Sequence, residues 1–441
     1  MSYRERLAQR QAELGRPLRV ALIGAGQMGM GMAAQVLRMP GTALSAVIDI
    51  DPDRAVGALA QAGVTATTAD STDAAVRVID DGGSVALRDA DVIGALPIDV
   101  VVEATGIPDV GARVFLSAVS NGIHYATLNV ETDVTVGTYL RRLSDEATGI
   151  YSVCRGDEPV ETKILVDFAR DLGFDIVAAG KGKNNPFKPY TVPSDLVEEA
   201  ARKKMNPQML CEFVDGSKAM IEMAALANTT GLEVSTRGMY GPASTVETLN
   251  KTFSMQSEGG VLDRPGVVDY CTGPVAPGVF VVATHPDAYV NHEMTYLLMG
   301  DGPNFTFYRP YHLASIEAPL TIYDMVLDGQ ASMTAEHWTA EVAAMTKRPL
   351  RAGETLDGVG GYMVRGIIDK ADDFARENLA PLGVLNGARV VRDLPQDHLI
   401  TRDDVELVED ATIVRLRHHQ DAMARGESAP GLAALAAELG L

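Results

Sequence analysis

The first apolar run of the chain breaks into glycines and then opens into a helical pattern. Residues 20–23 read Val-Ala-Leu-Ile, which is typical of a buried β-strand, and residues 28–37 carry apolar side chains at helical spacing. The glycine-rich segment between them is typical of the first strand–turn–helix unit of a dinucleotide-binding sheet, although a glycine-rich turn without a ligand is the alternative. The residues expected to contact the dinucleotide here are Gly24, Gly26, Gln27, Met28 and Gly29.

Each glycine of this segment has a separate physical task in that interpretation. Gly24 allows the tight turn, Gly26 lets the backbone approach a pyrophosphate, and Gly29 lets the helix pack closely on the strand. The N-terminus of the helix then supplies N–H donors and a partial positive charge. Asp49 follows a second apolar run, at the distance where a carboxylate meets the adenosine ribose.

Strand and helix patterns keep alternating to about residue 155, which predicts a mostly parallel, doubly wound sheet of the Rossmann type. A helix over 3–14 precedes the first strand, and the segment 99–103 is a clear buried strand followed by a turn of small residues. A helix over 108–121 and a strand over 122–129 follow. Strand ends of such a sheet meet at the ligand crevice. They add three candidate cofactor contacts, Thr105, Gly106 and Asn129.

The second predicted domain, over 156–345, contains a lysine-rich segment directly after a strand. A helical pattern runs from Pro159 to about residue 172, and the apolar run 175–180 then leads into a predicted loop over 180–186. Two lysines and two amides on one turn suit an anionic or polyhydroxylated substrate, and an exposed polar turn is the alternative. The candidate catalytic residues of this loop are Lys181, Lys183, Asn184 and Asn185.

Two further groups of polar residues follow in the same domain. Lys218 and Glu222 are four residues apart on a long Ala- and Met-rich helix that is expected to open at Phe213. They form either a buried catalytic pair or a solvated ion pair. Arg309, Tyr311 and His312 follow a strand and are candidate substrate contacts, with Arg309 as an anion clamp and His312 as an acid or base. A structural histidine at a helix start explains His312 equally well.

The last predicted region, over 346–441, consists of short β runs with turn residues and ends in an Ala/Leu helix. The chain has 441 residues, three scattered cysteines and a formal net charge of −21. That charge argues against a nucleic-acid surface, and the cysteine usage fits a reducing compartment. With a charged N-terminal helix in place of a signal peptide and no apolar run of membrane-spanning length, we expect a cytoplasmic protein without a membrane contact.

No metal-ligand spacing stands out along the sequence. Glu131 and Asp133 could hold a hard cation, but an acidic cluster at a helix N-terminus explains them equally well. The metal site is therefore left open.

The chain resembles the homoserine-dehydrogenase-like oxidoreductases that carry a C-terminal SAF module. Within that group it is similar to the 1-deoxy-D-xylulose 5-phosphate reductoisomerase-like proteins, and the resemblance covers nearly the whole chain. It implies NADPH, a divalent cation, a phosphorylated deoxy-sugar and a place in isoprenoid biosynthesis. The segments that carry it are 24–29, 103–106, 180–186, 215–218, 353–356 and 403–405.

Two departures from the family pattern change what the resemblance implies. Homoserine dehydrogenases place a catalytic lysine after the asparagine that ends a strand like 122–129, whereas here Val130 follows Asn129. Asp49, followed by Asp51, would repel a ribose 2′-phosphate, so the residues favour NAD(H), although Arg54 leaves room for NADP(H).

These observations predict an NAD(P)(H)-dependent oxidoreductase that acts on a small, polyhydroxylated, anionic alcohol or carbonyl compound. Lys181 or Lys183 would hold or polarise the substrate oxygen, and Lys218 would exchange the proton. A reductoisomerase acting on a sugar phosphate with a metal is one alternative. Others are a homoserine-dehydrogenase-like enzyme of another small polar compound and a non-catalytic nucleotide-sensing protein. We expect a homodimer.

Overall fold

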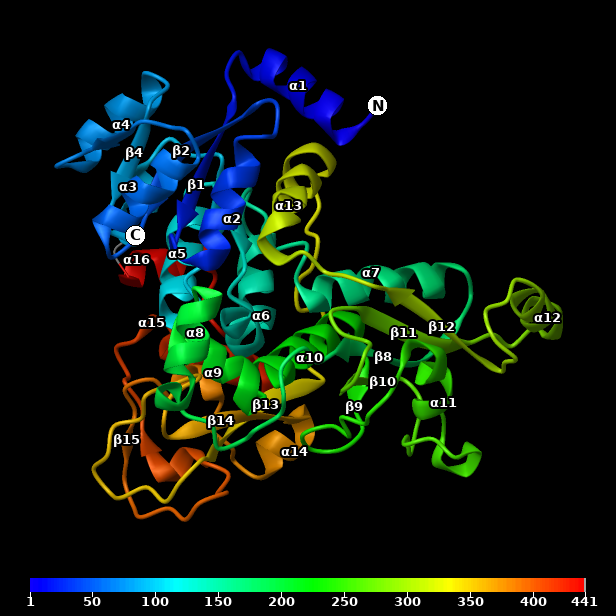
Figure 1. The fold of residues 1–441 in the computed structure, drawn as a ribbon. Coiled ribbons are helices and arrows are strands. Elements are labelled where there is room, and N and C mark those ends of the chain that lie inside the picture. Colours follow the sequence, from blue (N-terminus) through cyan, green and yellow to red (C-terminus); the bar gives the residue numbers. More distant parts are fainter. Residues whose placement is uncertain (440–441) are drawn as a thin grey trace. The chain divides into compact units, whose positions relative to one another are not determined.

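The computed structural model describes residues 1–439, which form two compact units (Figure 1). Each unit is assembled from separate stretches of the chain. The first unit contains Met1–Asp157, Leu313–Thr334 and Glu409–Leu441, and the second contains Glu158–His312 and Ala335–Val408.

The first unit is built on a seven-stranded sheet with the order β3-β4-β2-β1-β5-β6-β7, and all its strand pairs are parallel. The strand order reverses between β1 and β5, which is the point where doubly wound sheets bind their ligands. The prediction of a Rossmann-type parallel sheet is therefore confirmed. Its strands are β1 (Leu18–Ile23), β2 (Thr42–Ile48), β3 (Ala66–Thr68), β4 (Ser84–Leu87), β5 (Val100–Glu103), β6 (His124–Thr127) and β7 (Tyr151–Val153).

Helices of the first unit begin where the sequence offers caps. Asp51 caps α3 by accepting a hydrogen bond from the Asp53 N–H, and Ser2 caps α1 in a capping box with Glu5. Leu7 of α1 is fully buried, so this helix packs on its own unit. The α-helices of this unit are α1 (Tyr3–Leu14), α2 (Gln27–Val36), α3 (Pro52–Gln61), α4 (Thr72–Asp80), α5 (Pro108–Ser120), α6 (Val130–Asp145), α13 (Pro319–Tyr323), α15 (Thr412–Ala424) and α16 (Leu432–Leu439).

The second unit has a five-stranded mixed sheet with the order β12-β11-β8-β10-β9. The central strand β8 pairs in parallel with β10 and antiparallel with β11, so it is covered along both edges. Helices α7 (Glu158–Asp171) and α10 (Ser217–Thr230) pack against each other and against this sheet. The strands are β8 (Asp175–Gly182), β9 (Glu233–Val234), β10 (Val267–Cys271), β11 (Val279–Thr284) and β12 (Asn304–Arg309).

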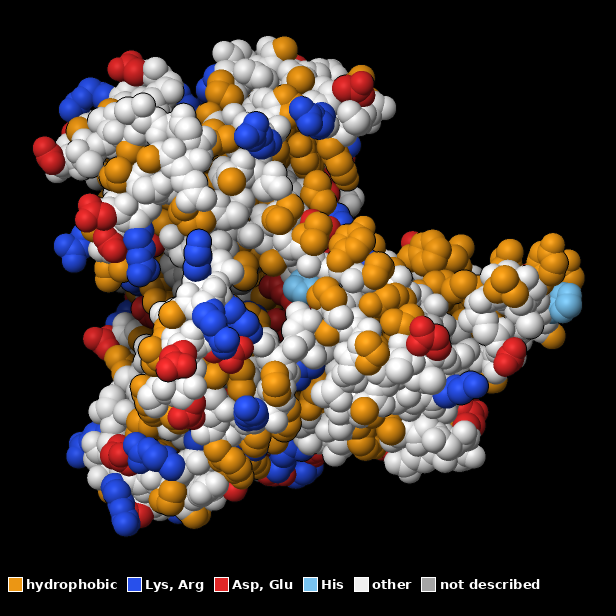
Figure 2. Space-filling view, in the orientation of Figure 1, with side chains coloured by type: hydrophobic (Ala, Val, Ile, Leu, Met, Phe, Trp, Pro, Cys, Tyr) orange, Lys and Arg blue, Asp and Glu red, His pale blue; other side chains and the backbone are white. Residues whose placement is uncertain are grey.

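Two hairpin-like pairs and several short helices complete this unit. Strands β13 (Ala340–Thr346) and β14 (Val364–Lys370) form one antiparallel pair, and β15 (Arg389–Val390) with β16 (Val405–Glu406) forms another. Exposed apolar side chains gather around α12, where Figure 2 shows them in orange. The remaining α-helices are α8 (Val197–Lys203), α9 (Pro207–Asp215), α11 (Leu249–Thr252), α12 (Ala288–Tyr296) and α14 (Ala371–Arg376).

Two predicted boundaries in the second unit were wrong. Strand β8 continues through Gly182, so the segment 180–182 is part of the central strand and not of a loop. The long helix expected to open at Phe213 is two helices, α9 and α10, separated by Gly216 in a left-handed conformation with φ 94°. Within residues 1–439, no helix is long and apolar enough to cross a membrane.

Candidate active site

The glycine turn of the first unit has the geometry that a dinucleotide needs. Gly24 has φ +91°, and a Cβ there would lie 2.9 Å from the backbone of Ala104. A Cβ on Gly29 would lie 1.9 Å from the carbonyl oxygen of Gly24, so only glycine lets α2 approach the turn. A Cβ on Gly26 would meet nothing within 4 Å, which leaves room beside the backbone for a phosphate.

The first turn of α2 offers its N–H groups to a ligand. Its N-cap is Gly26, and no side chain caps the helix. Helix N-termini leave their first N–H donors without helical partners, and Gln27 and Met28 lie in this first turn. An uncapped helix start beside open space is suited to a pyrophosphate, so these residues fit a dinucleotide cofactor.

Asp49 follows β2 and is held by the backbone around it. Its carboxylate accepts hydrogen bonds from the Ala25 N–H at 2.7 Å and from the Asp51 N–H at 2.9 Å. Arg54 forms an ion pair with Asp51 at 3.5 Å, so its charge is partly compensated. The Asp49 carboxylate is therefore fixed beside the glycine turn.

The turn after β5 is organised by a carboxylate that sequence reasoning missed. Glu103 is fully buried, and burial raises its pKa. It accepts hydrogen bonds from the Thr105 N–H at 2.7 Å and from the Thr127 hydroxyl at 3.1 Å, so it joins the ends of β5 and β6. An acidic residue ending an otherwise apolar strand is the sequence signal that could have indicated it.

The other two predicted cofactor contacts, Gly106 and Asn129, lie in different surroundings. Gly106 follows Thr105 in a left-handed conformation with φ +69° and lies in the turn itself. Asn129 is fully buried, donates to the Ile107 carbonyl at 3.0 Å and accepts from the Thr132 N–H at 3.2 Å. The Asn129 amide therefore hydrogen-bonds to the turn after β5 and caps α6.

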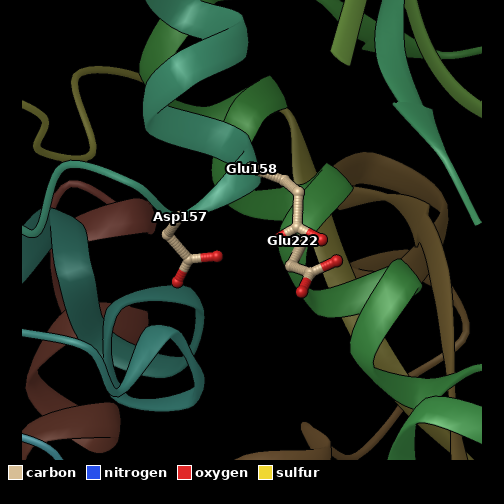
Figure 3. A group of neighbouring side chains, drawn as sticks. All are labelled: Asp157, Glu158 and Glu222. Carbon is tan, nitrogen blue, oxygen red and sulfur yellow. The ribbon is translucent and has the colours of Figure 1, made fainter. Parts of the chain in front are cut away.

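Lys181 is the centre of a charged cluster in the second unit. Its ammonium donates to Glu158 at 2.6 Å and also contacts Glu222, and the side chain is 7% exposed. Figure 3 shows Glu158 on the first turn of α7 and Glu222 on α10, pointing toward one another. Burial opposes the charge, but the two carboxylates outweigh it and raise the pKa of Lys181. The lysine therefore stays protonated at neutral pH.

The alternation of glycine and lysine explains why both lysines face this cluster. Successive side chains of a strand point to opposite faces, so positions 181 and 183 share one face. A Cβ on Gly180 would lie 1.7 Å from the Asp269 carbonyl oxygen, and one on Gly182 would lie 2.3 Å from the Ala276 nitrogen. The glycines thus allow close backbone packing on the other face.

Lys183 lies just past the end of β8 and is also buried. Its ammonium donates to the Phe213 carbonyl at 2.5 Å. Burial, helped by the charge of Lys181, lowers the pKa of Lys183 to about 8, against the opposing influence of Glu222 and Asp215. A lysine of this kind can exchange a proton close to neutral pH.

The structure does not bring the two asparagines of this segment to the lysine cluster. Asn184 is exposed, and Asn185 accepts a hydrogen bond from Lys203 of α8 at 3.4 Å. Asn184 and Asn185 are therefore close to the lysines in the sequence, but their side chains do not join the lysine cluster.

Helix α10 carries the other two candidate catalytic residues. Apart from Lys218, which is partly exposed, every residue of the helix is buried. Burial and the nearby Glu158 carboxylate raise the pKa of Glu222, while Lys181 and Lys218 act in the opposite direction. The buried partner of Glu222 is Lys181, so the predicted pair four residues apart is part of a larger cluster.

Two of the predicted substrate contacts after β12 interact with carboxylates of helix α7. Arg309 forms an ion pair with Glu161 and lies over the ring of Tyr311, 4.7 Å from its centroid. His312 Nε2 lies 3.2 Å from the same Glu158 oxygen that accepts from Lys181. Sequence reasoning missed Glu158 and Glu161, although acidic residues around a proline at a helix start were visible.

Neither of the two acidic clusters, Glu158 with Glu222 and Glu131 with Asp133, is well suited to a cation. Glu158, with Asp157 directly before it in the chain, and Glu222 offer oxygen ligands (Figure 3). The Lys181 ammonium, however, already contacts both glutamates. Glu131 and Asp133 are buried in the first turn of α6, where the helix dipole favours them. Asp133 accepts from the Tyr151 hydroxyl, and burial raises its pKa to about 6.

Residues 156–318 match the family described as "Oxidoreductase DRL, catalytic domain". This segment contains every candidate catalytic and substrate-binding residue, from Lys181 to His312. Together with the Rossmann-type sheet of the first unit, the match indicates an NAD(P)-dependent oxidoreductase. No curated protein matches the sequence.

Several solved structures are similar to the chain at low identity. A scyllo-inositol dehydrogenase from Lactobacillus casei is 12% identical over 72% of this chain and 90% of that chain, with a TM-score of 0.39. A myo-inositol dehydrogenase from Corynebacterium glutamicum is 12% identical over 71% and 90%, with a TM-score of 0.37. A DOX-P reductoisomerase in complex with NADPH, fosmidomycin and magnesium is 14% identical over 48% and 57%, with a TM-score of 0.33. The fold assignment stands on the sheet topology and not on these scores.

Proposed function

We propose that the protein transfers hydride between NAD(H) and a small, polyhydroxylated, anionic alcohol or carbonyl compound. The observation that carries this proposal is the donor set of Lys181. An ammonium has three N–H donors, and two of them are directed to Glu158 and Glu222. No group among residues 1–439 accepts the third, so a buried cationic donor remains for a substrate oxygen.

The buried lysines would divide the chemistry between them. Lys181 stays charged and would stabilise the negative charge that develops on the substrate oxygen during hydride transfer. Lys183, with its pKa lowered to about 8, would give or take the proton of that oxygen. Lys218 and Arg309 would bind the anionic part of the substrate, beside Tyr311 and His312. Asp49 favours NAD(H) over NADP(H).

A substrate panel tests this proposal directly. NAD⁺ reduction would be followed with hydroxy acids, polyols and sugar phosphates, and NADH oxidation with the corresponding carbonyl compounds, for the wild type, Lys183→Ala and Lys218→Ala. The matched control is Lys188→Ala, because Lys188 is an exposed lysine of the same segment. We expect turnover to fall in both test variants and to persist in the control. Unchanged turnover in both test variants would remove these roles.

The reductoisomerase alternative adds a rearrangement of the carbon skeleton and a divalent cation that organises two adjacent oxygens. Because Lys181 occupies the place between Glu158 and Glu222, we favour metal-independent hydride transfer. Dialysis against EDTA should then leave the rate unchanged. A rate that disappears with EDTA and returns with Mg²⁺ would favour the alternative.

Two broader proposals need separate measurements. The homodimer is tested by the molar mass from light scattering at several concentrations. A nucleotide-sensing role would be favoured by tight cofactor binding in equilibrium dialysis together with no hydride transfer across the whole panel.

A further inference from the structure

Helix α10, which carries two of the candidate catalytic residues, packs against the β13–β14 pair (Figure 1). At its start, the Gly366 N–H donates to the Ser217 hydroxyl at 2.7 Å. Near its end, the Asn228 side-chain oxygen accepts from the Thr339 and Ala340 N–H groups, both at 3.0 Å. The helix is therefore fixed by backbone groups of a distant part of the chain.

A buried ion pair reinforces the first of these attachments. Lys347, which follows β13, is 4% exposed, and its ammonium lies 2.7 Å from the Asp215 carboxylate. The same ammonium donates to the carbonyls of Thr191 at 2.9 Å and Gly361 at 2.7 Å. Its three donors thus join α9, β13 and two loops, and the fully buried Asp215 depends on it for compensation.

Asp215 lies at the junction of α9 and α10, close in the chain to residues of the site. Its other oxygen accepts from the Ser217 N–H at 2.8 Å, so it fixes the entry into α10. The Phe213 carbonyl that holds Lys183 is two residues away. The Asp215 charge also acts on Lys183, since it opposes the lowering of the lysine pKa.

We propose that the β13–β14 pair supports the geometry of the active site and that Lys347 is a positioning residue. Through Asp215, Lys347 fixes the α9–α10 junction, and the junction places Lys218 and the acceptor of Lys183. This inference rests on the proposed function. Both strands lie beyond residue 318, where the match to the oxidoreductase catalytic domain ends.

The test compares Lys347→Met, Asp215→Asn, the double variant and Ser217→Ala with a control, Lys370→Met. Lys370 ends β14 and is partly exposed. We expect kcat to fall about 10- to 100-fold in Lys347→Met, because small displacements of reacting groups cost that much. NADH affinity should stay unchanged in all variants. The double variant should recover stability but not kcat, since it removes the uncompensated charge without restoring the junction.

A second measurement follows the junction without a substrate. The rate at which acetic anhydride labels Lys183 is measured against pH by mass spectrometry. In Asp215→Asn the midpoint should move to lower pH, because the carboxylate no longer stabilises the lysine charge. A loss of fold alone would not produce this shift.

The outcomes separate the two proposals. If the wild type transfers no hydride, the proposed function fails, while the labelling shift still reports the junction. If Lys347→Met and Ser217→Ala keep full kcat and the Lys183 midpoint does not move in Asp215→Asn, the positioning role is overturned. If Lys347→Met does not fold, the test uses Ser217→Ala and the double variant instead.

Discussion

Two glycine-rich segments of the molecule lie at the ends of buried apolar runs, and their glycines serve opposite purposes. In 24–29 the chain leaves the sheet, with Gly24 in a left-handed turn and α2 starting directly afterwards. In 180–182 the chain stays in the sheet, and the glycines let the neighbouring backbone approach strand β8. Glycine at the end of an apolar run can therefore indicate either a turn or close packing of neighbouring backbones. The residues that alternate with the glycines distinguish the two cases.

The two segments also offer a ligand different chemistry. The first presents backbone N–H groups and open space, which suits the phosphates of a cofactor. The second presents the Lys181 ammonium, which two buried carboxylates keep charged, and Lys183, whose pKa is lowered by burial, and this pairing suits a change of charge during a reaction. The first segment thus depends on backbone geometry alone, whereas the second depends on Glu158 and Glu222.

The largest effect should come from Lys181→Met, which removes the buried charge but keeps much of the volume. We expect kcat to fall about 100- to 1,000-fold, as when a donor to a developing oxyanion is lost. Cofactor affinity, measured by NADH fluorescence, should stay unchanged. Lys188→Met is the control, and a kcat of Lys181→Met within threefold of the wild type would contradict the assigned role.

Gly180→Ala should destabilise the protein, because its Cβ would lie 1.7 Å from a backbone oxygen of β10. Backbone cannot move aside as a flexible side chain can, so we expect a loss of about 3 kcal/mol or more in the free energy of unfolding. Urea denaturation measures it. A stability equal to the wild type would mean that the segment is not a packed strand.

The third prediction concerns the pH dependence that Lys183 introduces. Its pKa in the folded state is about 8, below the 10.5 of an ordinary lysine, so the unfolded chain binds more protons between these values. Its contribution to stability therefore rises as pH increases from about 8 to about 10.5. Lys183→Met should lose this rise, as well as an ionisation near pH 8 in kcat/KM. Identical profiles for variant and wild type would refute it.

Gly26→Ala should have the smallest effect and should sharpen the contrast with Gly180→Ala. Its Cβ would enter open space, so the melting temperature should stay the same. The methyl group would instead crowd the pyrophosphate, and we expect the Kd for NADH to rise about tenfold, or about 1.4 kcal/mol. Unchanged affinity would argue against a pyrophosphate at this turn.

Sequence patterns predicted most of the first unit because its signals are local. The apolar strands, the Asp51 cap and the glycine turn each depend on residues close in the chain. The error at 180–182 had a local cause as well, since glycine and lysine were interpreted as turn residues. Their period of two, which is the period of a strand, was present in the sequence.

The sequence by itself determined which segments would be strands, which turn could hold a dinucleotide and which lysines were candidates, since these follow from backbone geometry and from side-chain period. Only the tertiary structure decided the electrostatics of those lysines. Glu158, Glu222 and His312 come from three separate segments, and Lys347 comes from a fourth. A pKa depends on which charges lie within a few ångströms and on how much water is excluded, and long-range packing sets both.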